Sequence, residues 1–454
     1  MKAICAGAGE VNYKIAEMLI SEGHSVTFLD KDERALQNIK EHLDVMTIRG
    51  NITSAASLKE SGAEDADILI ASGTHDEVNM VACTIGEEMG IPLNVAKIFD
   101  PEYLTNKSSR EVLKNRGVDF MVNPSKVIAD EIENIIKFRY TFEAKLYNDE
   151  VLLAAFKATD RSALLHHLVK EINQANKIKI VMIASRKGIV EVPAPNRRIK
   201  YGDLIYFFTK KEDFPASYEL FMYSKYENLK KVLVIGGEDS ISLTNVLLSE
   251  KFQKSDFELT FVEQDKEKAK NLAQKVKNLV INEENINLVF LSSDAVLNSD
   301  SVIIQAGSDK ERVSTAIIAK GFGGKYVVTS LKKMRHPKPY LKLGLDGLFN
   351  SNLVISNKIL NYIYNHEIKK MDILHSGLGQ GMHIKVSEDS KLKDITTEEL
   401  SKKNIGIGMM LRDGEYFYPD GEEILRVDDE IFLVDLSSKA ENIRTLLSKH
   451  RFNI

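Results

Sequence analysis

Short apolar runs alternate with amphipathic segments over the first 125 residues of the chain. The apolar runs predict strands at residues 2–6, 25–30, 45–49, 68–72 and 95–99. Between the first two of these, Val11, Ile15, Met18 and Leu19 fall at helical spacing. Strands that alternate with helices of about 10–15 residues predict a parallel, doubly wound sheet.

The same order of segments occurs twice along the chain, which indicates a tandem duplication. Four pairs of matching segments lie 226 to 229 positions apart, namely 2–7 with 231–236, 117–123 with 344–350, 188–193 with 414–419, and 202–205 with 428–431. Their common order and nearly constant offset are the signature of an internal repeat.

Each half divides again into two units. The predicted units are a Rossmann-like domain at 1–125, a small domain at 141–225, a second Rossmann-like domain at 229–352 and a second small domain at 370–454. The fold class is therefore α/β, a tandem duplication of a Rossmann-type doubly wound parallel sheet plus a small α+β C-terminal domain. The small domains are strand-rich, and their pattern suits dimer pairing as well as binding of a small ligand.

Two helices outside the Rossmann-like pattern are also predicted. Asn123-Pro124-Ser125 marks a turn and a helix start, so residues 126–140 form a hinge helix. Its apolar positions, such as Ile132 and Ile136, are expected to pack against a neighbouring subunit. A helix near 162–172 would carry His166 and His167 as surface or packing residues.

Composition and charge narrow the class of protein. The chain has 454 residues, a net charge of −5 and two cysteines. An acidic balance argues against a general nucleic-acid binder, and two cysteines exclude a disulfide framework and favour a reducing cytoplasm. No apolar run reaches the roughly 20 residues that cross a bilayer, and a strand pattern at the start leaves no room for a signal peptide.

A glycine loop follows the first strand and carries the main chemical signal. Gly7-Ala8-Gly9-Glu10-Val11-Asn12 matches G-x-G-x-x-G with asparagine in the last place. The glycines allow a tight turn and close approach of a pyrophosphate to the start of the next helix. Asp30 ends the second strand, where a carboxylate accepts both ribose hydroxyls and repels a 2′-phosphate. NAD or an adenine nucleotide is therefore favoured over NADP; the alternative is a glycine turn with an exposed aspartate.

Asn12 departs from the pattern, because the third glycine normally allows close packing of helix on strand. The asparagine must either move the helix outward or find room for its amide. Either way, weakened rather than abolished binding is expected.

The corresponding loop of the second half lacks the glycine pattern of a phosphate-binding loop. It reads Gly236-Gly237-Glu238-Asp239, so Glu238 stands where a pyrophosphate would approach the backbone. Carboxylates about 4 Å from a phosphate would repel it strongly in a partly buried site. Glu263 still ends the following strand at the ribose-acid position. One nucleotide site per chain, in the first half, is therefore predicted.

These residues resemble the TrkA family, the cytosolic regulatory subunits of bacterial Trk potassium uptake systems, whose domains are of the regulator-of-potassium-conductance type. The resemblance extends over the full length and rests on these segments of the first half: 7–11, 30, 50–51, 65–67, 76–83 and 96–103. It implies NAD(H) or ATP/ADP as ligand, a homotetramer, and a membrane-embedded potassium-translocating subunit of the Trk type as partner. It also implies a cytoplasmic protein held peripherally at the inner face of the membrane by that partner.

The resemblance also assigns site residues. The phosphate loop falls on Gly7, Ala8, Gly9, Glu10 and Val11, and the ribose acid on Asp30. Gly73 and Thr74 lie in the segment that closes over the nucleotide, and Lys97 stands where the family usually has an arginine that meets a phosphate.

Two further positions of the resemblance are ambiguous. Phe99 replaces a second arginine, which weakens the case for recognition of a terminal phosphate and for ATP specificity. Asp76 and Glu77 either serve the nucleotide or only favour the dipole of a helix.

An enzyme is not expected, and no catalytic or metal-ligating residue is assigned. A dehydrogenase needs a proton-transfer residue beside the nicotinamide, and the ten histidines form no such constellation. The function predicted is nucleotide-dependent regulation of a potassium channel or transporter. The alternatives are an NAD-dependent oxidoreductase and a scaffold subunit that does not respond to nucleotides.

Overall fold

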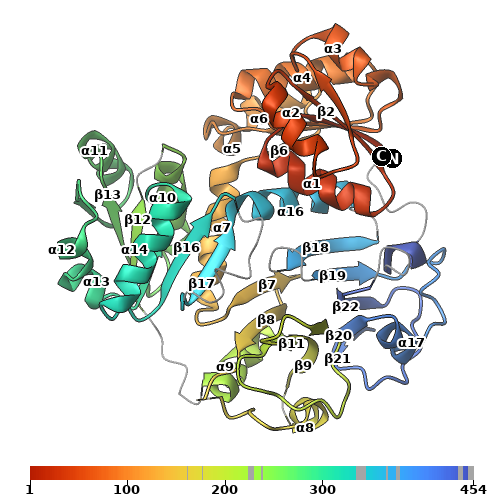
Figure 1. Cartoon of the computed structure of the whole chain (residues 1–454), viewed down its shortest axis with the longest axis vertical. Coiled ribbons are helices and arrows are strands. Elements are labelled where there is room, and N and C mark those ends of the chain that lie inside the picture. The colour runs from red at the N-terminus through yellow and green to blue at the C-terminus, as the bar shows by residue number, and fades with distance from the viewer. Residues whose placement is uncertain are drawn as a thin grey trace.

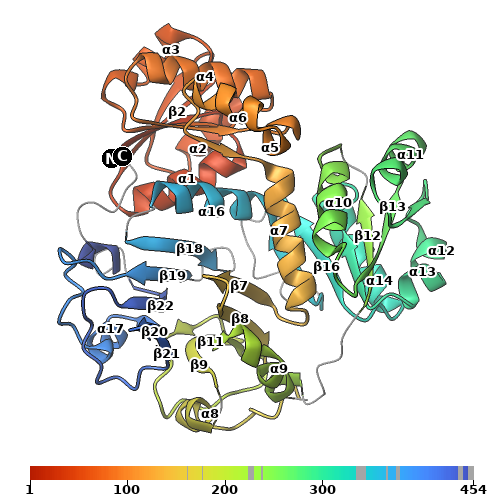
Figure 2. The same cartoon turned by 180° about the vertical axis from the view of Figure 1, so that it is seen from behind.

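The computed structural model contains four β-sheets, arranged as two Rossmann-like units beside two strand-rich units (Figure 1 and Figure 2). It describes the chain apart from residues 161, 176, 223–229, 237–238, 334–343, 365–366, 375–378, 438–442 and 448–454. Both six-stranded sheets are parallel, and both five-stranded sheets are antiparallel.

The first sheet has the strand order β3-β2-β1-β4-β5-β6 of a dinucleotide-binding fold. Its strands are β1 Lys2–Ala6, β2 Ser25–Asp30, β3 Met46–Arg49, β4 Ile68–Ala71, β5 Leu93–Lys97 and β6 Phe120–Val122. The accompanying helices are α1 Glu10–Ser21, α2 Glu33–Lys40, α3 Ala55–Glu60, α4 Asp76–Glu88, α5 Glu102–Thr105 and α6 Lys107–Lys114. The sixth strand was not predicted, because three residues are too few for a periodic signal.

The third sheet repeats this order as β14-β13-β12-β15-β16-β17. Its strands are β12 Lys231–Gly236, β13 Glu258–Glu263, β14 Leu279–Asn282, β15 Ser301–Ile304, β16 Val327–Leu331 and β17 Gly347–Asn350. Its helices are α10 Asp239–Phe252, α11 Lys266–Lys275, α12 Leu288–Leu291, α13 Asp294–Leu297, α14 Asp309–Gly321 and α16 Ser351–Ile363. Together with the strand-rich units, this repetition confirms the predicted fold class.

The strand-rich units also share one topology. The orders are β10-β9-β11-β8-β7 and, in equivalent positions, β21-β20-β22-β19-β18. The first has β7 Glu143–Tyr147, β8 Val151–Lys157, β9 Lys179–Ala184, β10 Val190–Glu191 and β11 Leu204–Lys210, with α8 Val169–Ala175 and α9 Phe214–Met222. The second has β18 Ile368–Leu374, β19 Gly379–Lys385, β20 Ile405–Arg412, β21 Glu415–Phe417, β22 Glu430–Asp435 and α17 Thr397–Lys402.

The predicted helix at 162–172 was placed too early. His166 has a positive φ of 70°, which an interior helical residue does not adopt, and its amide donates to the carbonyl of Ile199 at 2.9 Å. Helix α8 begins only at Val169, so both histidines precede it.

The hinge helix α7 runs over Pro124–Lys137, so it begins two residues before and ends three residues before the predicted segment 126–140. The Asn123 side chain accepts a hydrogen bond from the amide of Lys126 at 3.0 Å and caps the helix. Its apolar face, including Ile132 and Ile136, is buried against α10 of the second half. The expected partner for this face was wrong: the duplicated half of the same chain covers it, and α16 packs in the same way on α1 (Figure 1).

The two strand-rich sheets pack face to face around one apolar core. Glycines of the second sheet make room for larger residues of the first. A Cβ on Gly406 would lie 2.6 Å from the Val181 carbonyl oxygen, and one on Gly408 would overlap the ring of Phe208. The halves therefore complement each other in shape and are not interchangeable at this interface.

Gly408→Ala is expected to destabilise the chain by about 1–3 kcal/mol, because the added methyl overpacks the ring of Phe208. Gly321→Ala is the matched control, since a Cβ there meets nothing within 4 Å. Thermal unfolding of both variants tests the fit. Equal melting temperatures of the two variants would show that the sheets accommodate the added methyl group at Gly408 without loss of stability.

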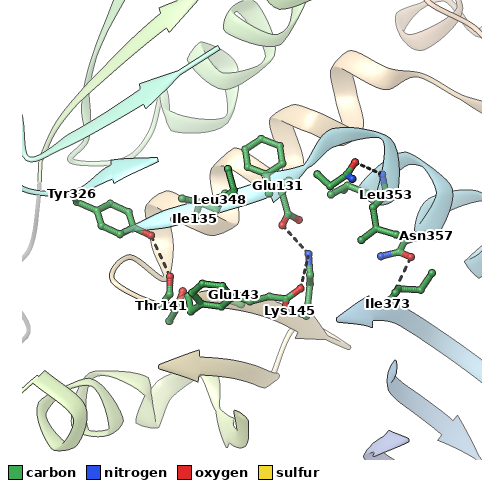
Figure 3. A pocket seen from close by; sticks show the side chains of 16 residues that line it. Glu131, Ile135, Thr141, Glu143, Lys145, Tyr326, Leu348, Leu353, Asn357 and Ile373 are labelled. Carbon is green, nitrogen blue, oxygen red and sulfur yellow. Dashed lines mark hydrogen bonds and ion pairs between the residues drawn. The ribbon is translucent and has the colours of Figure 1, made fainter. Parts of the chain in front are cut away.

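A buried ion cluster lies where α7, β7 and the second half meet, beside a small cavity of about 40 Å³ (Figure 3). The Lys145 ammonium lies 2.7 Å from a carboxylate oxygen of Glu131 and 4.0 Å from one of Glu143. Tyr206 donates its hydroxyl to Glu143 at 2.9 Å. Burial alone would lower the pKa of Lys145, but the carboxylates of Glu131, Glu143 and Asp372 outweigh it and hold that pKa above its usual value.

Candidate nucleotide site

The glycine loop between β1 and α1 has the shape that a phosphate cradle requires. Gly7 has a φ of +109°, and a Cβ there would lie 3.3 Å from the amide nitrogen of Gly73. Gly9 precedes α1 in an extended conformation, and a Cβ on it would meet nothing within 4 Å. The approach to the first amides of α1 is thus open above Gly9. Amide donors and the positive end of a helix dipole favour an anion at this point.

Asn12 finds room for its amide beneath the loop. Its side chain is fully buried, and its nitrogen donates to the carbonyls of Gly7 at 2.9 Å and of Ala6 and Ile70 at 3.3 Å. The amide therefore ties the loop to β1 and β4. The sequence left two possibilities, an outward shift of the helix or room for the Asn12 amide, and the structure has the second.

Asp30 lies at the carboxyl end of β2 and holds the loop from the other side. Its carboxylate accepts the amide of Ala8 at 2.6 Å and the amide of Asp32 at 2.9 Å. An ionised carboxylate has about four acceptor sites. Two therefore remain for the hydroxyls of a ribose.

Gly73 and Thr74 follow β4 and border the loop. Gly73 is fixed by Asn79 of α4, whose side chain accepts the Gly73 amide at 2.7 Å and donates to the carbonyls of Gly73 at 3.2 Å and Lys97 at 2.8 Å. Sequence reasoning did not assign a site role to Asn79. A polar residue at a position of α4 that faces the core was the signal that could have revealed it.

Lys97 ends β5 and reaches the same edge of the sheet. Its ammonium donates to the carbonyl of Ser72 at 2.8 Å and lies 5.2 Å from the centre of the Phe99 ring. Burial lowers the pKa of Lys97 to about 8, against a smaller opposite effect of Asp76. An anion bound beside Lys97 would favour its charged form and raise this pKa again.

Asp76 has a structural role. Its carboxylate accepts the amides of Phe99 and Asp100, each at 2.8 Å, and so ends β5 two residues earlier than predicted. Asp309 of the second half accepts the amides of Lys332 at 3.0 Å and Lys333 at 2.9 Å in the same way. Glu77 is exposed.

The equivalent crevice of the second unit contains different side chains. Arg312 stands 233 residues after Asn79 and donates to the Ser330 hydroxyl at 3.2 Å. That hydroxyl donates to Gln305 at 3.1 Å, and Ser330 and Gln305 stand in the places of Lys97 and Ser72. Glu263 is fully buried, and burial raises its pKa. Gly237 and Glu238, on which the prediction of a lost site rested, lie outside the described residues.

Two kinds of feature are absent from the described residues. No group of three or more His, Cys, Asp and Glu side chains in that part of the chain is arranged to hold a metal ion. Over the same residues, no helix has both the length and the apolar character needed to cross a membrane.

Residues 3–124 match the model of the TrkA-N domain, and these residues include the loop, Asp30 and Lys97. The first unit is therefore similar to a TrkA-N domain over nearly its whole length. The Trk system potassium uptake protein TrkA of Azorhizobium caulinodans is 24% identical over 453 residues, covering 98% of each chain. The TrkA of Haemophilus influenzae is 25% identical over 450 residues, covering 97% of this chain and 96% of that one. The predicted resemblance to the TrkA family is therefore confirmed.

Solved structures share the fold of the whole chain. The GsuK channel superposes with a TM-score of 0.59 at 12% identity, covering 98% of this chain and 78% of that one. A GsuK channel bound to NAD gives 0.58 at 13% identity, with the same coverage. The RCK domain of GsuK gives 0.57 at 13% identity, covering 97% and 93%. The chain therefore has the same fold as the GsuK RCK domain.

Proposed function

We propose that this chain is a nucleotide-binding regulatory subunit of a membrane potassium uptake system. The observation that carries the proposal is the combination of an open loop at Gly9, a ribose acid at Asp30 and a half-buried lysine at Lys97 on one sheet edge of a TrkA-N domain. The family resemblance over nearly the whole chain supports the transport system as its context.

The proposed ligand is NAD(H) or an adenine nucleotide such as ATP or ADP. The loop from Gly7 to Val11 would hold the phosphates through its amides from Gly9 onward, because the amides of Gly7 and Ala8 already bond Leu29 and Asp30. Asp30 would bind the ribose hydroxyls. Lys97 would meet a phosphate as a point charge, and Gly73 and Thr74 would border it. The fit is supported by the open side of Gly9 and by the two acceptor sites left on Asp30.

The proposed mechanism is a shift between two conformations with unequal nucleotide affinity. The hinge is the segment 123–140, because α7 leaves the first unit and packs on α10 of the second. A change in the angle between the Rossmann-like units would be read by a Trk-type membrane subunit that conducts potassium. A homotetramer, held at the inner face of the membrane by that subunit, is the proposed assembly.

Regulation is favoured over catalysis. In an NAD-dependent oxidoreductase, a proton-transfer residue should stand beside the β4 and β5 ends, where the nicotinamide of a dinucleotide lies. The side chains described there include Ser72, His75, Asp76, Lys97 and Phe99. Lys97 is engaged with a carbonyl, Asp76 with two backbone amides, and His75 is exposed at the start of α4. Oxidation of NADH with any of a panel of carbonyl substrates would instead support an NAD-dependent oxidoreductase. If no nucleotide changes the melting temperature, a scaffold subunit that does not respond to nucleotides would be favoured.

Calorimetric titration with NADH, NAD, ATP and ADP is the direct test. At least one nucleotide is expected to bind with one site per chain, and at 100 times its Kd to stabilise the fold by about 2.7 kcal/mol. Asp30→Ala and Gly9→Asp should abolish this response, since they remove the ribose acceptor and block the phosphates. Asp44→Ala, an exposed acid of the same unit, is the control. Unchanged affinity in both site variants would refute the pocket, and two equivalent sites would refute the predicted asymmetry.

A further inference from the structure

The second Rossmann-like unit has its own counterpart of the nucleotide site, at the edge of the sheet where β12, β13 and β15 end (β12 and β13 in Figure 1). We name it the second edge. Glu263 ends β13 and pairs in register with Gly236, the last residue of β12. On the other side of β12, the amide of Gln305 donates to the carbonyl of Ile235 at 2.7 Å. Because neighbouring strands lie about 4.8 Å apart, the backbones of Glu263 and Gln305 stand about 10 Å from each other across the end of β12.

Two buried polar atoms at the second edge have no hydrogen-bond partner among the described residues. Glu263 is fully buried, and its Oε1 accepts the amide of Asp265 at 3.2 Å, whereas its Oε2 is unpaired. Gln305 is 2% exposed, and its Oε1 accepts the Ser330 hydroxyl at 3.1 Å, whereas its Nε2 is unpaired. Buried polar groups are nearly always paired, because an unpaired one loses its hydration without compensation. An acceptor and a donor of this kind on one sheet edge point to a ligand that bonds both.

Two further side chains fix the direction of the Gln305 donor. Arg312 of α14 donates to the Ser330 hydroxyl at 3.2 Å. Because that hydroxyl accepts from a guanidinium, its own proton goes to Gln305, and the amide is held with its oxygen toward Ser330. The Nε2 atom therefore faces away from Ser330. Ser330 and Arg312 are both buried, so bulk water does not compete for these bonds.

We propose that the second edge binds the ribose of a nucleoside that carries no phosphate. Glu263 stands 233 residues after Asp30, in the place where a carboxylate accepts the hydroxyls of a ribose. Its Oε2 accepts a ribose hydroxyl, and the Nε2 of Gln305 donates to a ligand oxygen above the end of β12. Ligands of parallel sheets bind outside the carboxyl ends of the strands at this point of the strand order.

The surroundings of the second edge disfavour a phosphate. Ser330 stands in the place of Lys97, so this strand lacks the cation that would meet a phosphate in the first unit. The guanidinium of Arg312 is engaged with Ser330 and orients Gln305. The loop sequence of this unit also lacks the glycine pattern that lets a pyrophosphate approach the backbone. A nucleoside therefore suits the second edge better than NAD or ATP.

Equilibrium dialysis of the full chain with adenosine, guanosine, cytidine and uridine tests the proposal. It is done in an Asp30→Ala background, which removes the ribose acid of the first unit. At least one nucleoside is expected to bind at one site per chain, and its 2′-deoxy form and its 5′-diphosphate about tenfold more weakly or less. The 2′-deoxy form lacks a hydroxyl that Glu263 accepts, and the diphosphate adds charge that the second edge does not balance. These comparisons need no replacement at the second edge.

Glu263→Leu and Gln305→Glu should each lower the affinity for that nucleoside about tenfold or more. The first removes the acceptor. The second keeps the oxygen that Ser330 bonds and turns the donor into an acceptor. Glu258→Gln, at an exposed position of the same strand, is the matched control, and melting temperatures verify that all three variants fold.

If none of the four nucleosides binds, water alone pairs these atoms and the proposal is overturned. A diphosphate that binds as tightly as its nucleoside would also overturn it, and so would binding that survives Glu263→Leu. Wild type is measured beside the background, because nucleoside binding that disappears with Asp30→Ala belongs to the first unit. Such a result would count against the second edge alone and would leave the proposed function to its own titrations.

Discussion

Lys145→Met is expected to destabilise the chain by about 3–5 kcal/mol, the largest effect of any single replacement considered for this protein. The side chain of Lys145 is 7% exposed, and its ammonium lies between the carboxylates of Glu131 and Glu143. Methionine keeps the length of the side chain but leaves both carboxylates buried without a cation. The full desolvation cost of those two charges then lowers the free energy of unfolding.

Unfolding by urea and by heat measures this effect, with Lys157→Met on the exposed face of the neighbouring strand β8 as control. The control should stay within about 0.5 kcal/mol of wild type, as surface replacements usually do. Lys145→Met combined with Glu131→Leu should recover part of the loss, because an apolar pair of similar volume replaces a buried ion pair at little cost. A stable single variant would show that water reaches the cluster.

Lys97→Met is expected to have opposite effects on stability and on binding. Burial lowers the pKa of Lys97 to about 8, so at pH 7 folding must keep a charge in a site that disfavours it. Methionine removes that cost, and nucleotide-free protein should become more stable by about 1–3 kcal/mol. A proposed phosphate contact is lost at the same time, and nucleotide affinity should fall about tenfold or more.

The pH dependence separates this explanation from a simple packing effect. The folded pKa lies below the unfolded value of about 10.4, so the unfolded chain binds more protons between pH 8 and 10.4. Stability of wild type should therefore rise over that window relative to Lys97→Met. Nucleotide affinity should fall above pH 8, since a bound phosphate needs the protonated lysine. Parallel stability curves for the two proteins from pH 7 to 10 would show that Lys97 is not a buried charge.

Much of the fold could be predicted because its signals are local. The glycine loop, the Asn123 cap and the alternation of strands and helices each depend on residues close in sequence. Errors arose where distant groups decide. Asp76 ends β5 through amides 23 and 24 residues away, and His166 is drawn out of a helix by Ile199.

The candidate site shows the same division. Residues on the loop and Asp30 were assigned from spacing alone, and their meeting at one edge follows from the parallel sheet. The role of Asn79 was missed. Its side chain bonds the backbone of Gly73 and of Lys97, and the sequence does not show that these two segments are neighbours. The loop sequence could not show whether the Asn12 side chain would fit, because one of its hydrogen-bond acceptors, the Ile70 carbonyl, belongs to the distant strand β4.

The sequence by itself determined that this protein is a duplicated α/β chain with one intact glycine loop and a ribose acid, because periodicity and turn chemistry act over a few residues. Only the tertiary structure decided that α7 packs on the second half, that Lys145 is enclosed by carboxylates, and that Glu263 and Gln305 are buried at one sheet edge. The physical reason is that burial and electrostatic interaction depend on distance in space, and these contacts join residues 14 to 119 positions apart.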